Sequence, residues 1–515
     1  MRMPEKLAAP LLAVAAFAAA PAAAQSNTAP TTATIDFEDP VGTIQPEIYG
    51  QFVEHLGTQI YRGGLFVGED SDIPNTDGIR NDVFDALDKL DIPVMRWPGG
   101  CFADLYHWRD GVGERTVRDN LAWGGTPEPN SFGTHEFFNL AERLGAKTYL
   151  NINVGTGTVQ EAADWLEYIT SESESALAQE RRANGRAEPW KVDYLTFGNE
   201  TWDCGGNMRP EYYGDLYAQY ATFVKAAGEQ PYMVLSGSHD SNPEYSAKLL
   251  ENPEVAALTD GVSLHFYTLP TGDWNAKGKA LGFPKSEWVS SMARTQRMDA
   301  VIVRQLELMD AASPNKKVDI LPDEWGMWVD TEEGDPALHQ QGTIRDAVVA
   351  ATNFNIFHKH ADRVPMTNIA QMVNVLQAMI LTDGPRMTLT PTYHVYEMYK
   401  PFQGATALPL SLDSPRYTLG ERSFDALSAT AALTPSGDLV LGLVNADPDV
   451  ARTLAMNVGD RRLVSARVLT GAAMDSHNSF DAPNTVQPAA MNVPVTSGTA
   501  SFALPARSVV VATFR

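Results

Sequence analysis

Short apolar runs alternate with longer segments of helical spacing along most of this chain. Eight runs between Pro46 and Met398 are rich in β-branched and aromatic residues and have the length of buried strands. They span residues 47–55, 93–100, 146–155, 193–200, 232–239, 261–268, 318–326 and 365–373. Between them, apolar residues recur every three or four positions, as in amphipathic helices, at residues 78–90, 158–170, 211–227 and 343–361.

This alternation favours an α/β fold. Eight strands separated by helices predict a parallel (β/α)8 TIM barrel, because parallel neighbours need a crossover connection that is usually a helix. A doubly wound open sheet is the alternative. The barrel is favoured because polar residues follow the strands all round the series, and only a closed sheet brings the ends of all its strands to one site.

The pattern changes after residue 402 to short runs of strand-like alternation separated by Gly, Pro, Asp and Asn. The runs at 438–446, 461–469 and 500–514 have hardly any helical period and are typical of an antiparallel β-sandwich. We therefore predict a catalytic barrel over residues 46–402 and a β-sandwich over 403–515. The segment 25–45 contains a similar alternation and is predicted to add a strand to the sandwich.

The first 24 residues resemble a secretory signal peptide. Arg2 and Lys6 precede an apolar stretch over residues 7–20, and Ala22 and Ala24 form a site of the A-x-A type. We expect cleavage near Ala24 and export to the periplasm or the medium. No later segment is apolar enough to span a bilayer, so no membrane association is predicted.

Length and charge narrow the class of protein. A chain of 515 residues, 44% of them hydrophobic, is long enough for a catalytic domain and a smaller module. Its 64 acidic and 39 basic side chains give a formal net charge of −25, which makes nucleic acid a poor partner. No Cys or His spacing fits a zinc site, and no phosphate-binding loop is present, so neither a metal nor a cofactor is predicted.

Two carboxylates follow predicted barrel strands. Glu200 ends the run in "DYLTFGNE", and Glu324 lies in "VDILPDEWG". In a barrel the C-terminal ends of the strands form the active-site face, so both side chains are delivered to one mouth. A pair of carboxyl groups about 5 Å apart is what a retaining glycosidase needs, one as proton donor and one as nucleophile.

Aromatic residues near the strand ends are compatible with a sugar substrate, because flat apolar faces bind the C–H surfaces of sugars. For any single tryptophan, packing in the core is the better interpretation, but as a set they favour a carbohydrate site. The tryptophans concerned are Trp108, Trp123, Trp202, Trp325 and Trp328.

Several motifs together resemble the α-L-arabinofuranosidases of glycoside hydrolase family 51, in order from about residue 46 to the C-terminus. The resemblance implies a (β/α)8 barrel with glutamates after the fourth and seventh strands, a β-sandwich, retention of configuration and no metal. The motifs are "IYGQFVEHLG", "RWPGGCFADLYHWRDGVG", "YLTFGNETWDCGGNMRPEYY", "SLHFYT", "LPDEWGMW" and "NIAQMVNVLQ".

The resemblance also assigns roles residue by residue. It implies that Glu200 is the acid/base and Glu324 the nucleophile. Matches to positions that bind the arabinofuranosyl hydroxyls are Glu54, Asn199 and Gln371. Matches to residues around the nucleophile are Arg96, His265 and Tyr267, and matches to aromatics that wall the pocket are Trp123 and Trp328. From the residues alone, Glu54 could instead form an ion pair with His55, and Arg96 could be purely structural.

The cysteines mark a departure from the family. Cys101 stands after "PGG", where some members have an asparagine that contacts the sugar, and thiol is a far weaker hydrogen-bonding group. Cys204 lies four residues beyond Glu200, so both cysteines are expected over the same barrel mouth. In an exported protein a Cys101–Cys204 disulfide is predicted, with two free thiols as the alternative.

The function predicted from these observations is a retaining exo-α-L-arabinofuranosidase. Its partner would be an arabinose-containing polysaccharide or oligosaccharide, namely arabinoxylan, arabinan or their fragments. An endo-acting β-glucanase or xylanase of the same family is the enzymatic alternative, and a non-catalytic carbohydrate-binding protein is the alternative of another class. The resemblance is also compatible with a homo-oligomer.

Overall fold

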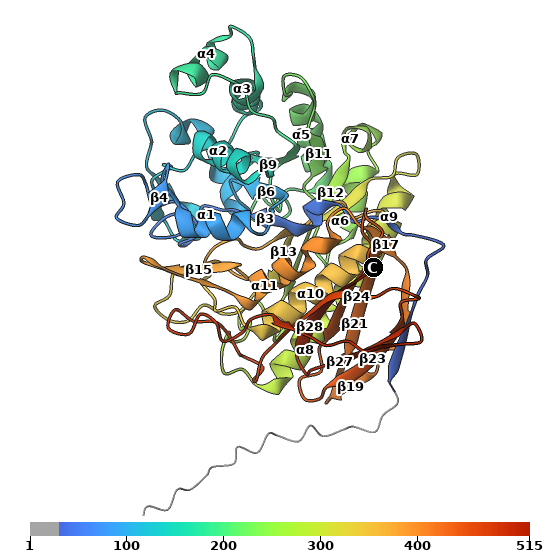
Figure 1. The fold of residues 1–515 in the computed structure, drawn as a ribbon. Coiled ribbons are helices and arrows are strands. Elements are labelled where there is room, and N and C mark those ends of the chain that lie inside the picture. The colour runs from blue at the N-terminus through green and yellow to red at the C-terminus, as the bar shows by residue number, and fades with distance from the viewer. Residues whose placement is uncertain (1–29) are drawn as a thin grey trace, which may run out of the picture.

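The computed structural model describes residues 30–515, which form a barrel packed on a β-sandwich (Figure 1). The eight predicted barrel strands all form and close in the order β10-β11-β12-β13-β14-β3-β6-β9, every neighbouring pair parallel. This confirms the closed barrel over the open sheet. The strands are β3 (Gly50–Phe52), β6 (Val94–Trp97), β9 (Lys147–Ile152), β10 (Tyr194–Phe197), β11 (Tyr232–Leu235), β12 (Gly261–Thr268), β13 (Asp319–Met327) and β14 (Asn368–Ile369).

Helices surround the barrel and return the chain between its strands. The four segments with predicted helical spacing contain α1, α3, α5 and α10. The helices from the first strand to the last are α1 (Asn81–Asp88), α2 (Thr134–Leu144), α3 (Val159–Thr170), α4 (Ala176–Ala183), α5 (Pro210–Phe223), α6 (Glu244–Leu250), α7 (Pro253–Leu258), α8 (Lys285–Thr295), α9 (Arg297–Ala312) and α10 (Ile344–Lys359), and α11 (Pro391–Tyr399) follows.

Helix α10 lies between the barrel and the sandwich. It begins at a capping box in which Thr343 and Asp346 satisfy each other's backbone N–H groups. Fifteen of its sixteen residues are buried, because one face packs on the barrel and the other on the sandwich sheet. Asn355 binds Ser428 of that sheet at 3.0 Å. Figure 1 shows the helix beside α11, next to the strands of the sandwich.

The sandwich consists of a five-stranded and a seven-stranded sheet. The first has the order β18-β1-β23-β27-β26 and the second β2-β17-β21-β22-β28-β24-β25. Their bounds are β18 (Leu410–Leu412), β1 (Thr31–Ile35), β23 (Arg452–Asn457), β27 (Thr499–Leu504), β26 (Val495–Thr496), β2 (Gly42–Thr43), β17 (Thr406–Leu408), β21 (Leu427–Leu433), β22 (Leu439–Asn445), β28 (Ser508–Phe514), β24 (Leu463–Thr470) and β25 (Ala489–Ala490).

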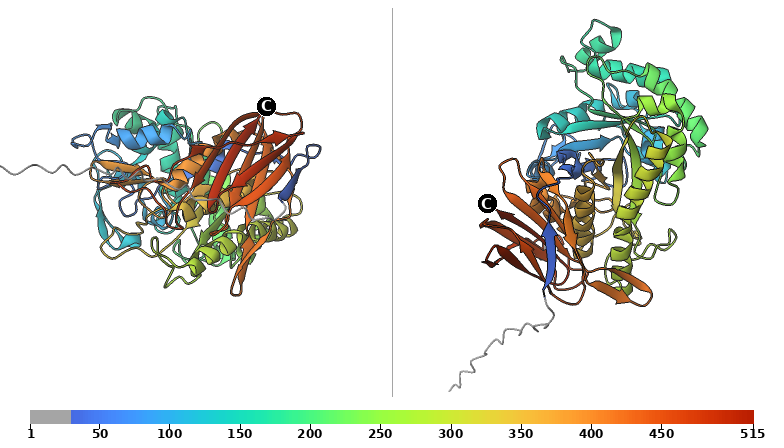
Figure 2. Two further views of the ribbon diagram at one scale, coloured as in Figure 1. Left: turned by 60° about the horizontal axis from the view of Figure 1, so that its bottom comes forward. Right: turned by 90° about the vertical axis from the view of Figure 1, so that its right-hand side faces the viewer.

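The N-terminal strand β1 belongs to the five-stranded sheet, between β18 and β23 (Figure 2, right). It pairs antiparallel with β18 but parallel with β23, the single departure from the antiparallel pattern in the two sheets of residues 30–515. Strand β22 is buried along its whole length, because its sheet is covered on both faces.

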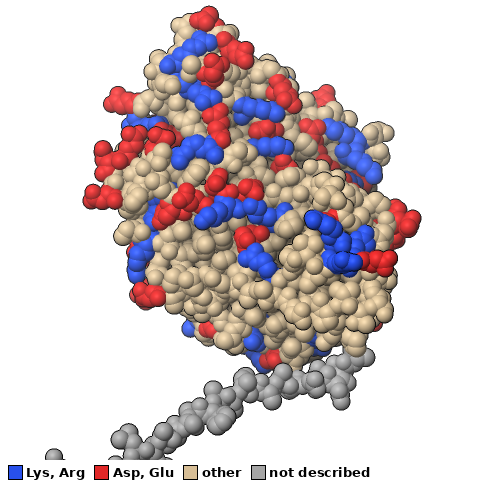
Figure 3. All heavy atoms as spheres, viewed as in Figure 1, with Lys and Arg blue, Asp and Glu red and all other residues tan. Residues whose placement is uncertain are grey.

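On the molecular surface, acidic and basic side chains lie close together over the face in Figure 3. The net negative charge is therefore not gathered there into a single acidic surface. None of the helices in residues 30–515 combines the length and apolar character needed to cross a bilayer.

Candidate active site

A pocket of about 630 Å³ opens at the C-terminal ends of the barrel strands. Nine of the predicted site residues line it: Glu54, Cys101, Trp123, Glu200, His265, Tyr267, Glu324, Trp328 and Gln371. Arg96 and Asn199 do not line it but lie buried beneath it, 1% and 2% exposed. The barrel therefore brings together predicted side chains from six different strands or the loops that follow them.

Glu324 on β13 is held at both carboxylate oxygens. The Tyr267 hydroxyl donates to Oε1 at 2.7 Å, and Arg96 donates to Oε2 at 2.9 Å. Both contacts orient the carboxyl group, because each donor fixes one of its two oxygens, and Arg96 adds a charge-assisted hydrogen bond. An ionised, oriented carboxylate in a pocket can act as a nucleophile.

Glu200 follows β10 in a left-handed backbone conformation with φ of 43°. The turn is stabilised because its carbonyl accepts hydrogen bonds from the N–H groups of Asp203 and Gly205, at 2.7 and 3.1 Å. Oε1 of its carboxyl group accepts from Nδ1 of His265 at 2.8 Å. The side chain is 17% exposed and faces the pocket, where it can exchange a proton with a bound molecule.

His265 on β12 is surrounded by three carboxylates. Nδ1 lies 3.6 Å from Glu324, and Nε2 lies 3.5 Å from Asp323, in addition to the contact with Glu200. Burial alone would lower the pKa of His265, but the charges of Glu324 and Glu200 and the hydrogen bond with Asp323 outweigh burial and raise it to about 10. The imidazole is therefore a cation at neutral pH, and it links the two glutamates.

The two glutamates are close enough for a double displacement. A carboxylate oxygen of Glu200, one of Glu324 and a ring nitrogen of His265 all lie within 4.8 Å of one another. Inverting glycosidases keep their carboxyl groups roughly 6.5–9.5 Å apart to admit a water, whereas retaining ones keep them about 5 Å apart. The separation matches the retaining arrangement.

The same three side chains also have a spacing that could hold a metal ion. The Glu324 oxygens are, however, already bound by the Tyr267 hydroxyl and the Arg96 cation. A guanidinium bound to a ligand oxygen repels a divalent cation and competes for the same lone pair. A second such group, Cys101, Glu200 and Cys204, offers no thiolate because its sulfurs are joined.

The sequence analysis missed Asp323, a buried carboxylate 1% exposed beneath the site. It accepts from the hydroxyls of Tyr149 at 2.7 Å and Ser263 at 2.6 Å. Burial alone would raise its pKa, but Arg96 and His265 outweigh burial and hold this pKa below its usual value. Asp323 therefore keeps a negative charge that anchors the two cations of the site.

A bulge in β13 explains how Asp323 and Glu324 both serve the same site. Ser263 pairs with Leu321, but His265 pairs with Glu324, so β13 has one more residue than β12 over this stretch. Bulges re-aim side chains that would otherwise alternate between the two faces of a sheet. The "PDEW" motif contains two adjacent acidic residues, which could have pointed to both as site residues. Strict alternation along a strand, however, would place only one of the two side chains inside the barrel.

Glu54 follows β3 at the closed end of the pocket and is 2% exposed. Oε1 accepts from the N–H groups of Gly100 and Phe102, both at 3.1 Å, and from the Trp123 indole at 3.3 Å. Oε2 accepts from Gln371 at 2.8 Å. Burial raises the pKa of Glu54 to about 7, aided by the charge of Glu324 and opposed by hydrogen bonds from Phe102 and Gln371.

Gln371 presents an acceptor to the same end of the pocket. Its Nε2 donates a hydrogen bond to Glu54, but its buried Oε1 has no hydrogen-bond partner within residues 30–515. An unpaired buried carbonyl oxygen costs free energy unless a ligand satisfies it. A hydroxyl group of a bound sugar would supply that partner.

Asn199 is held by its backbone and by its side chain. Its Oδ1 accepts from Arg96, and its N–H donates to the buried carboxylate of Asp104 at 2.9 Å. Asp104 also accepts from the N–H groups of Val154 at 2.8 Å and Gly155 at 3.0 Å. Asp104, which the sequence analysis did not identify, therefore joins the loops after β6, β9 and β10 beneath the acid/base candidate.

The five tryptophans divide into two groups. Trp123 and Trp328 pack at the pocket beside Tyr267, and Trp202 also lines the cavity. Trp108 and Trp325 are 1% and 0% exposed and belong to the hydrophobic core. The position of a tryptophan after a predicted strand could not show whether it lines the pocket or packs in the core. The direction of each ring depends on the loop that carries it.

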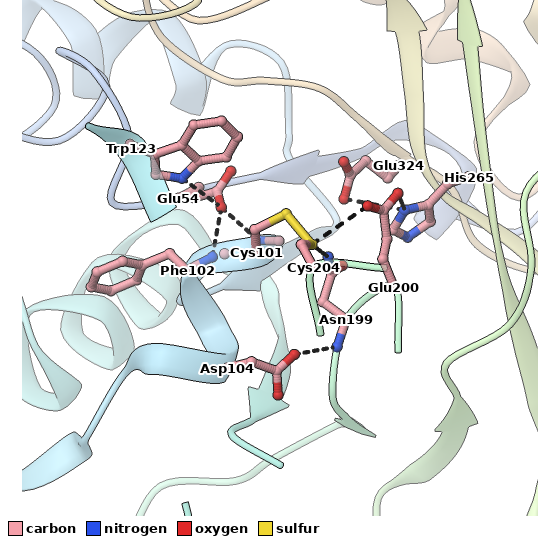
Figure 4. Close-up of a disulfide and its surroundings, with 12 residues drawn as sticks. Glu54, Cys101, Phe102, Asp104, Trp123, Asn199, Glu200, Cys204, His265 and Glu324 are labelled. Atoms are coloured by element: carbon pink, nitrogen blue, oxygen red, sulfur yellow. Dashed lines mark hydrogen bonds and ion pairs between the residues drawn. A yellow bond between two sulfur atoms is a disulfide. The ribbon is translucent and has the colours of Figure 1, made fainter. Parts of the chain in front are cut away.

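A disulfide joins Cys101 and Cys204 across the pocket edge. Figure 4 shows it between Glu54 and Trp123 on one side and Glu200, His265 and Glu324 on the other. Its sulfur atoms have no proton to donate, so the asparagine contact of some family members is not replaced by a thiol. The preceding glycine leaves room for these side chains, because a Cβ on Gly100 would crowd Glu324 at 3.2 Å and Glu54 at 3.4 Å.

Comparison with protein families gives two matches along the chain. Residues 86–280 match the α-L-arabinofuranosidase 1 domain, and residues 323–508 match the α-L-arabinofuranosidase C-terminal domain. A Bacteroides ovatus protein named intracellular exo-α-L-arabinofuranosidase is 46% identical over 501 residues, which cover 95% of this chain and 97% of the relative.

Two crystal structures are similar over nearly the whole chain. The family 51 arabinofuranosidase of Xanthomonas axonopodis pv. citri is 44% identical with a TM-score of 0.91, covering 94% of this chain and 100% of that one. An arabinose complex of the α-L-arabinofuranosidase from Thermotoga maritima is 28% identical with a TM-score of 0.83, covering 94% and 99%.

The prediction of export is wrong, because the 46% identical Bacteroides ovatus relative is named an intracellular enzyme. The segment that suggested a signal peptide, residues 1–24, lies outside the described residues. Export to an oxidising compartment therefore no longer argues for the disulfide, and the evidence for this bond is the structure itself.

Proposed function

The chain belongs to the α-L-arabinofuranosidases of glycoside hydrolase family 51, and from this premise we propose that it is a retaining exo-α-L-arabinofuranosidase acting at the pocket described above. One observation carries the proposal. Two carboxylates face each other within 4.8 Å, one held by Tyr267 and Arg96 and the other bound to His265.

In the first step Glu324 attacks the anomeric carbon of the arabinofuranosyl group, and the bond to the leaving oxygen breaks. Glu200 gives its proton to that oxygen, so the leaving group departs as a neutral alcohol. Tyr267 and Arg96 hold the attacking carboxylate in one orientation, which lowers the cost of orientation in the transition state.

In the second step Glu200 acts as a base. It takes a proton from water, the resulting oxygen attacks the anomeric carbon, and the ester bond to Glu324 breaks. Two displacements on opposite faces retain the configuration. His265, which binds Glu200 at 2.8 Å, offers a positive charge to that carboxyl group when it is ionised.

The hydroxyl groups of the arabinofuranosyl ring are bound at the closed end of the pocket. Glu54 offers its Oε2 atom, which accepts from Gln371, and Gln371 offers the unpaired Oε1 atom. Asn199 is held by Arg96 beneath the ring, with its Nδ2 directed only at the weak acceptor Sγ of Cys204 at 3.8 Å. Trp123 and Trp328 supply apolar walls.

The enclosed end of the pocket favours release of single terminal units over internal cleavage. Glu54 is 2% exposed and covered by the residues that bind it, so a polysaccharide chain cannot continue beyond it. The substrates we propose are arabinoxylan, arabinan and their oligosaccharides. An endo-acting β-glucanase or xylanase would need a cleft that is open at both ends.

We also propose the division into a catalytic domain over residues 46–402 and a sandwich over residues 403–515. Assembly into a homo-oligomer is a further expectation from family resemblance. Light scattering of the purified protein measures its mass directly, against 56.1 kDa for one chain.

Purified protein assayed on 4-nitrophenyl α-L-arabinofuranoside, 4-nitrophenyl β-xyloside and carboxymethyl cellulose tests the proposal. We expect turnover of the arabinofuranoside at least a hundredfold above the other two. Arabinose should be released from arabinoxylan with no shortening of its backbone. Faster cleavage of carboxymethyl cellulose or of the xylan backbone would overturn the exo-acting assignment.

A further inference from the structure

The Cys101–Cys204 disulfide shares the edge of the pocket with the carboxyl group of Glu200 (Figure 4). Sγ of Cys204 lies 3.6 Å from Oε2 of Glu200, whereas the other oxygen of that carboxyl group is bound by His265. One sulfur of each cysteine and one oxygen of Glu200 all lie within 4.8 Å of one another. Because thiolate is the form of cysteine that binds metals, this group of atoms cannot hold an ion while the disulfide is intact.

We propose that reduction of this disulfide creates a binding site for a soft divalent cation of the zinc class, held by Cys101, Cys204 and Glu200, and that the bound ion stops turnover. Two thiolates, one carboxylate and a water in the fourth position are a ligand set that zinc accepts, whereas magnesium and calcium prefer oxygen ligands alone. Metal binding is independent of the proposed function. The loss of turnover rests on it, because the ion would occupy the acid/base carboxyl group.

A dithiol is the reductant in the first step. Cys204 is exposed and Cys101 only partly so, which makes the sulfur of Cys204 the accessible point of attack. One thiolate of the dithiol bonds to that sulfur, the disulfide breaks, and Cys101 leaves as a thiolate that takes a proton. The second thiol then attacks the mixed disulfide and releases Cys204. The dithiol becomes a disulfide, and two electrons and two protons have passed to the cysteines. A zinc ion that binds both sulfurs returns those two protons to the solvent.

The backbone holds both cysteines in place by contacts that reduction does not break. The N–H groups on either side of Cys101 both donate to Glu54, at 3.1 Å. Those on either side of Cys204 donate to the carbonyl of Glu200, at 2.7 and 3.1 Å. The carboxylate of Asp104, three residues after Cys101, accepts from the backbone of the second loop at 2.9 Å. The two α-carbons, 5.6 Å apart, therefore stay close after the disulfide is cut.

The spacing and the charge of the three ligands suit a tetrahedral ion. Ligand atoms about 2.0–2.3 Å from a tetrahedral zinc ion lie roughly 3.3–3.8 Å from one another. The distance of 3.6 Å between Cys204 and Glu200 is already in that range, and the two sulfurs need only turn apart. His265 places one positive charge on the far oxygen of Glu200, but two thiolates and a carboxylate supply three negative charges.

Cadmium binding to the full-length protein tests the site directly. One half of a sample is reduced with dithiothreitol and separated from it by gel filtration under nitrogen, and the other half stays oxidised. We expect the reduced chain to bind one cadmium ion with the ultraviolet charge-transfer absorption of a cadmium–thiolate bond. Zinc should displace that ion, and the oxidised chain should show no such absorption. A reduced chain without the absorption would overturn the site.

Substitutions identify the ligands. Glu200→Gln keeps both thiols and should weaken cadmium affinity at least about tenfold, since even the loss of an outer-shell partner costs a metal site that much. Asp203→Asn is the matched control, because its carboxylate lines the same pocket but lies outside the ligand group, and it should leave the affinity unchanged. Equal affinities in these two variants would rule out Glu200 as a ligand.

The sulfur ligands are tested by the double variant Cys101→Ser, Cys204→Ser, which should show no cadmium–thiolate absorption after treatment with dithiothreitol. If this variant does not fold, the reduced wild type can be alkylated with iodoacetamide instead. Alkylation blocks both sulfurs without changing the sequence, so the absorption should again be absent. Absorption that survives either treatment would place the cadmium ion elsewhere and overturn the site.

Turnover of 4-nitrophenyl α-L-arabinofuranoside separates the metal site from the proposed function. Zinc should inhibit the reduced enzyme at concentrations that leave the oxidised enzyme active, each compared with its own rate without metal, and EDTA should restore the rate. If neither form is active without metal, the proposed function fails, while cadmium absorption still decides the metal site. Equal inhibition of both forms, or full turnover by a reduced enzyme that has bound zinc, would overturn the proposed block of Glu200.

Discussion

The Tyr267 hydroxyl donates a hydrogen bond of 2.7 Å to Oε1 of Glu324. The two residues come from the neighbouring strands β12 and β13, which pair along most of their length. Arg96 reaches the other oxygen from β6, on a different side of the barrel. The Glu324 carboxyl group is thus positioned from two directions by hydrogen-bond donors, and this arrangement can be tested one group at a time.

Replacing Tyr267 with phenylalanine removes the hydroxyl group but keeps the ring. A hydrogen bond to a charged group contributes about 1.5–3 kcal/mol, so kcat/KM should fall roughly ten- to a hundredfold if the bond strengthens in the transition state. The melting temperature measured by circular dichroism should change little. Unchanged kcat/KM would mean that the hydroxyl does not serve the nucleophile.

Glu324→Ala should abolish hydrolysis, because it removes the carboxylate proposed to attack the anomeric carbon. Azide can enter the vacated space and attack an activated substrate such as dinitrophenyl arabinofuranoside from the same side. The azide product, identified by NMR, should have the inverted configuration. If the variant keeps more than about a tenth of wild-type activity, a barrier change under about 1.4 kcal/mol, the role of nucleophile is wrong.

Glu200→Ala should affect substrates unequally. A dinitrophenyl leaving group departs with little protonation, whereas a sugar leaving group needs a full proton. We expect a loss on arabino-oligosaccharides that is at least tenfold greater than the loss on dinitrophenyl arabinofuranoside. Equal losses on both substrates would argue against proton donation by Glu200.

His265 should make stability depend on pH over a defined window. The pKa of the folded state, about 10, exceeds the ordinary 6.5, so the charged ring stabilises the fold fully below pH 6.5. This contribution is lost as the pH rises through about 10. The melting temperature of His265→Gln should therefore lie furthest below that of the wild type under pH 6.5, and the gap should narrow up to pH 10. A constant gap would show that the imidazolium is not responsible.

The disulfide joins residues 103 positions apart. Loop-closure estimates give up to about 4–5 kcal/mol of stabilisation for a loop of that length. Ellman titration of the denatured, unreduced protein should find close to zero free thiols. A reductant should then lower the free energy of unfolding in urea, whereas the double variant Cys101→Ser, Cys204→Ser should not respond. A titration that finds two free thiols per chain in the unreduced protein would show that the disulfide is absent.

The amino-acid sequence by itself determines the barrel strands and the positions of the two glutamates at its mouth. A strand is recognised from apolar residues a few positions apart, and the residue after a parallel strand lies at its C-terminal end whatever the rest of the chain does. Glu200 after "LTFG" and Glu324 in the C-terminal half of the run "DILPDEWGM" therefore required only local information.

Only the tertiary structure decides which partners these residues meet. Asp104 binds backbone groups of loops about 50 and 95 positions away, and Asp323 faces the site because of a bulge that depends on its pairing with β12. Trp108, Trp202 and Trp325 look equivalent along the chain, yet only Trp202 lines the pocket. Such contacts join residues that are distant in sequence, so they are set by how the barrel closes and how each loop turns, and neither is encoded in a local periodicity.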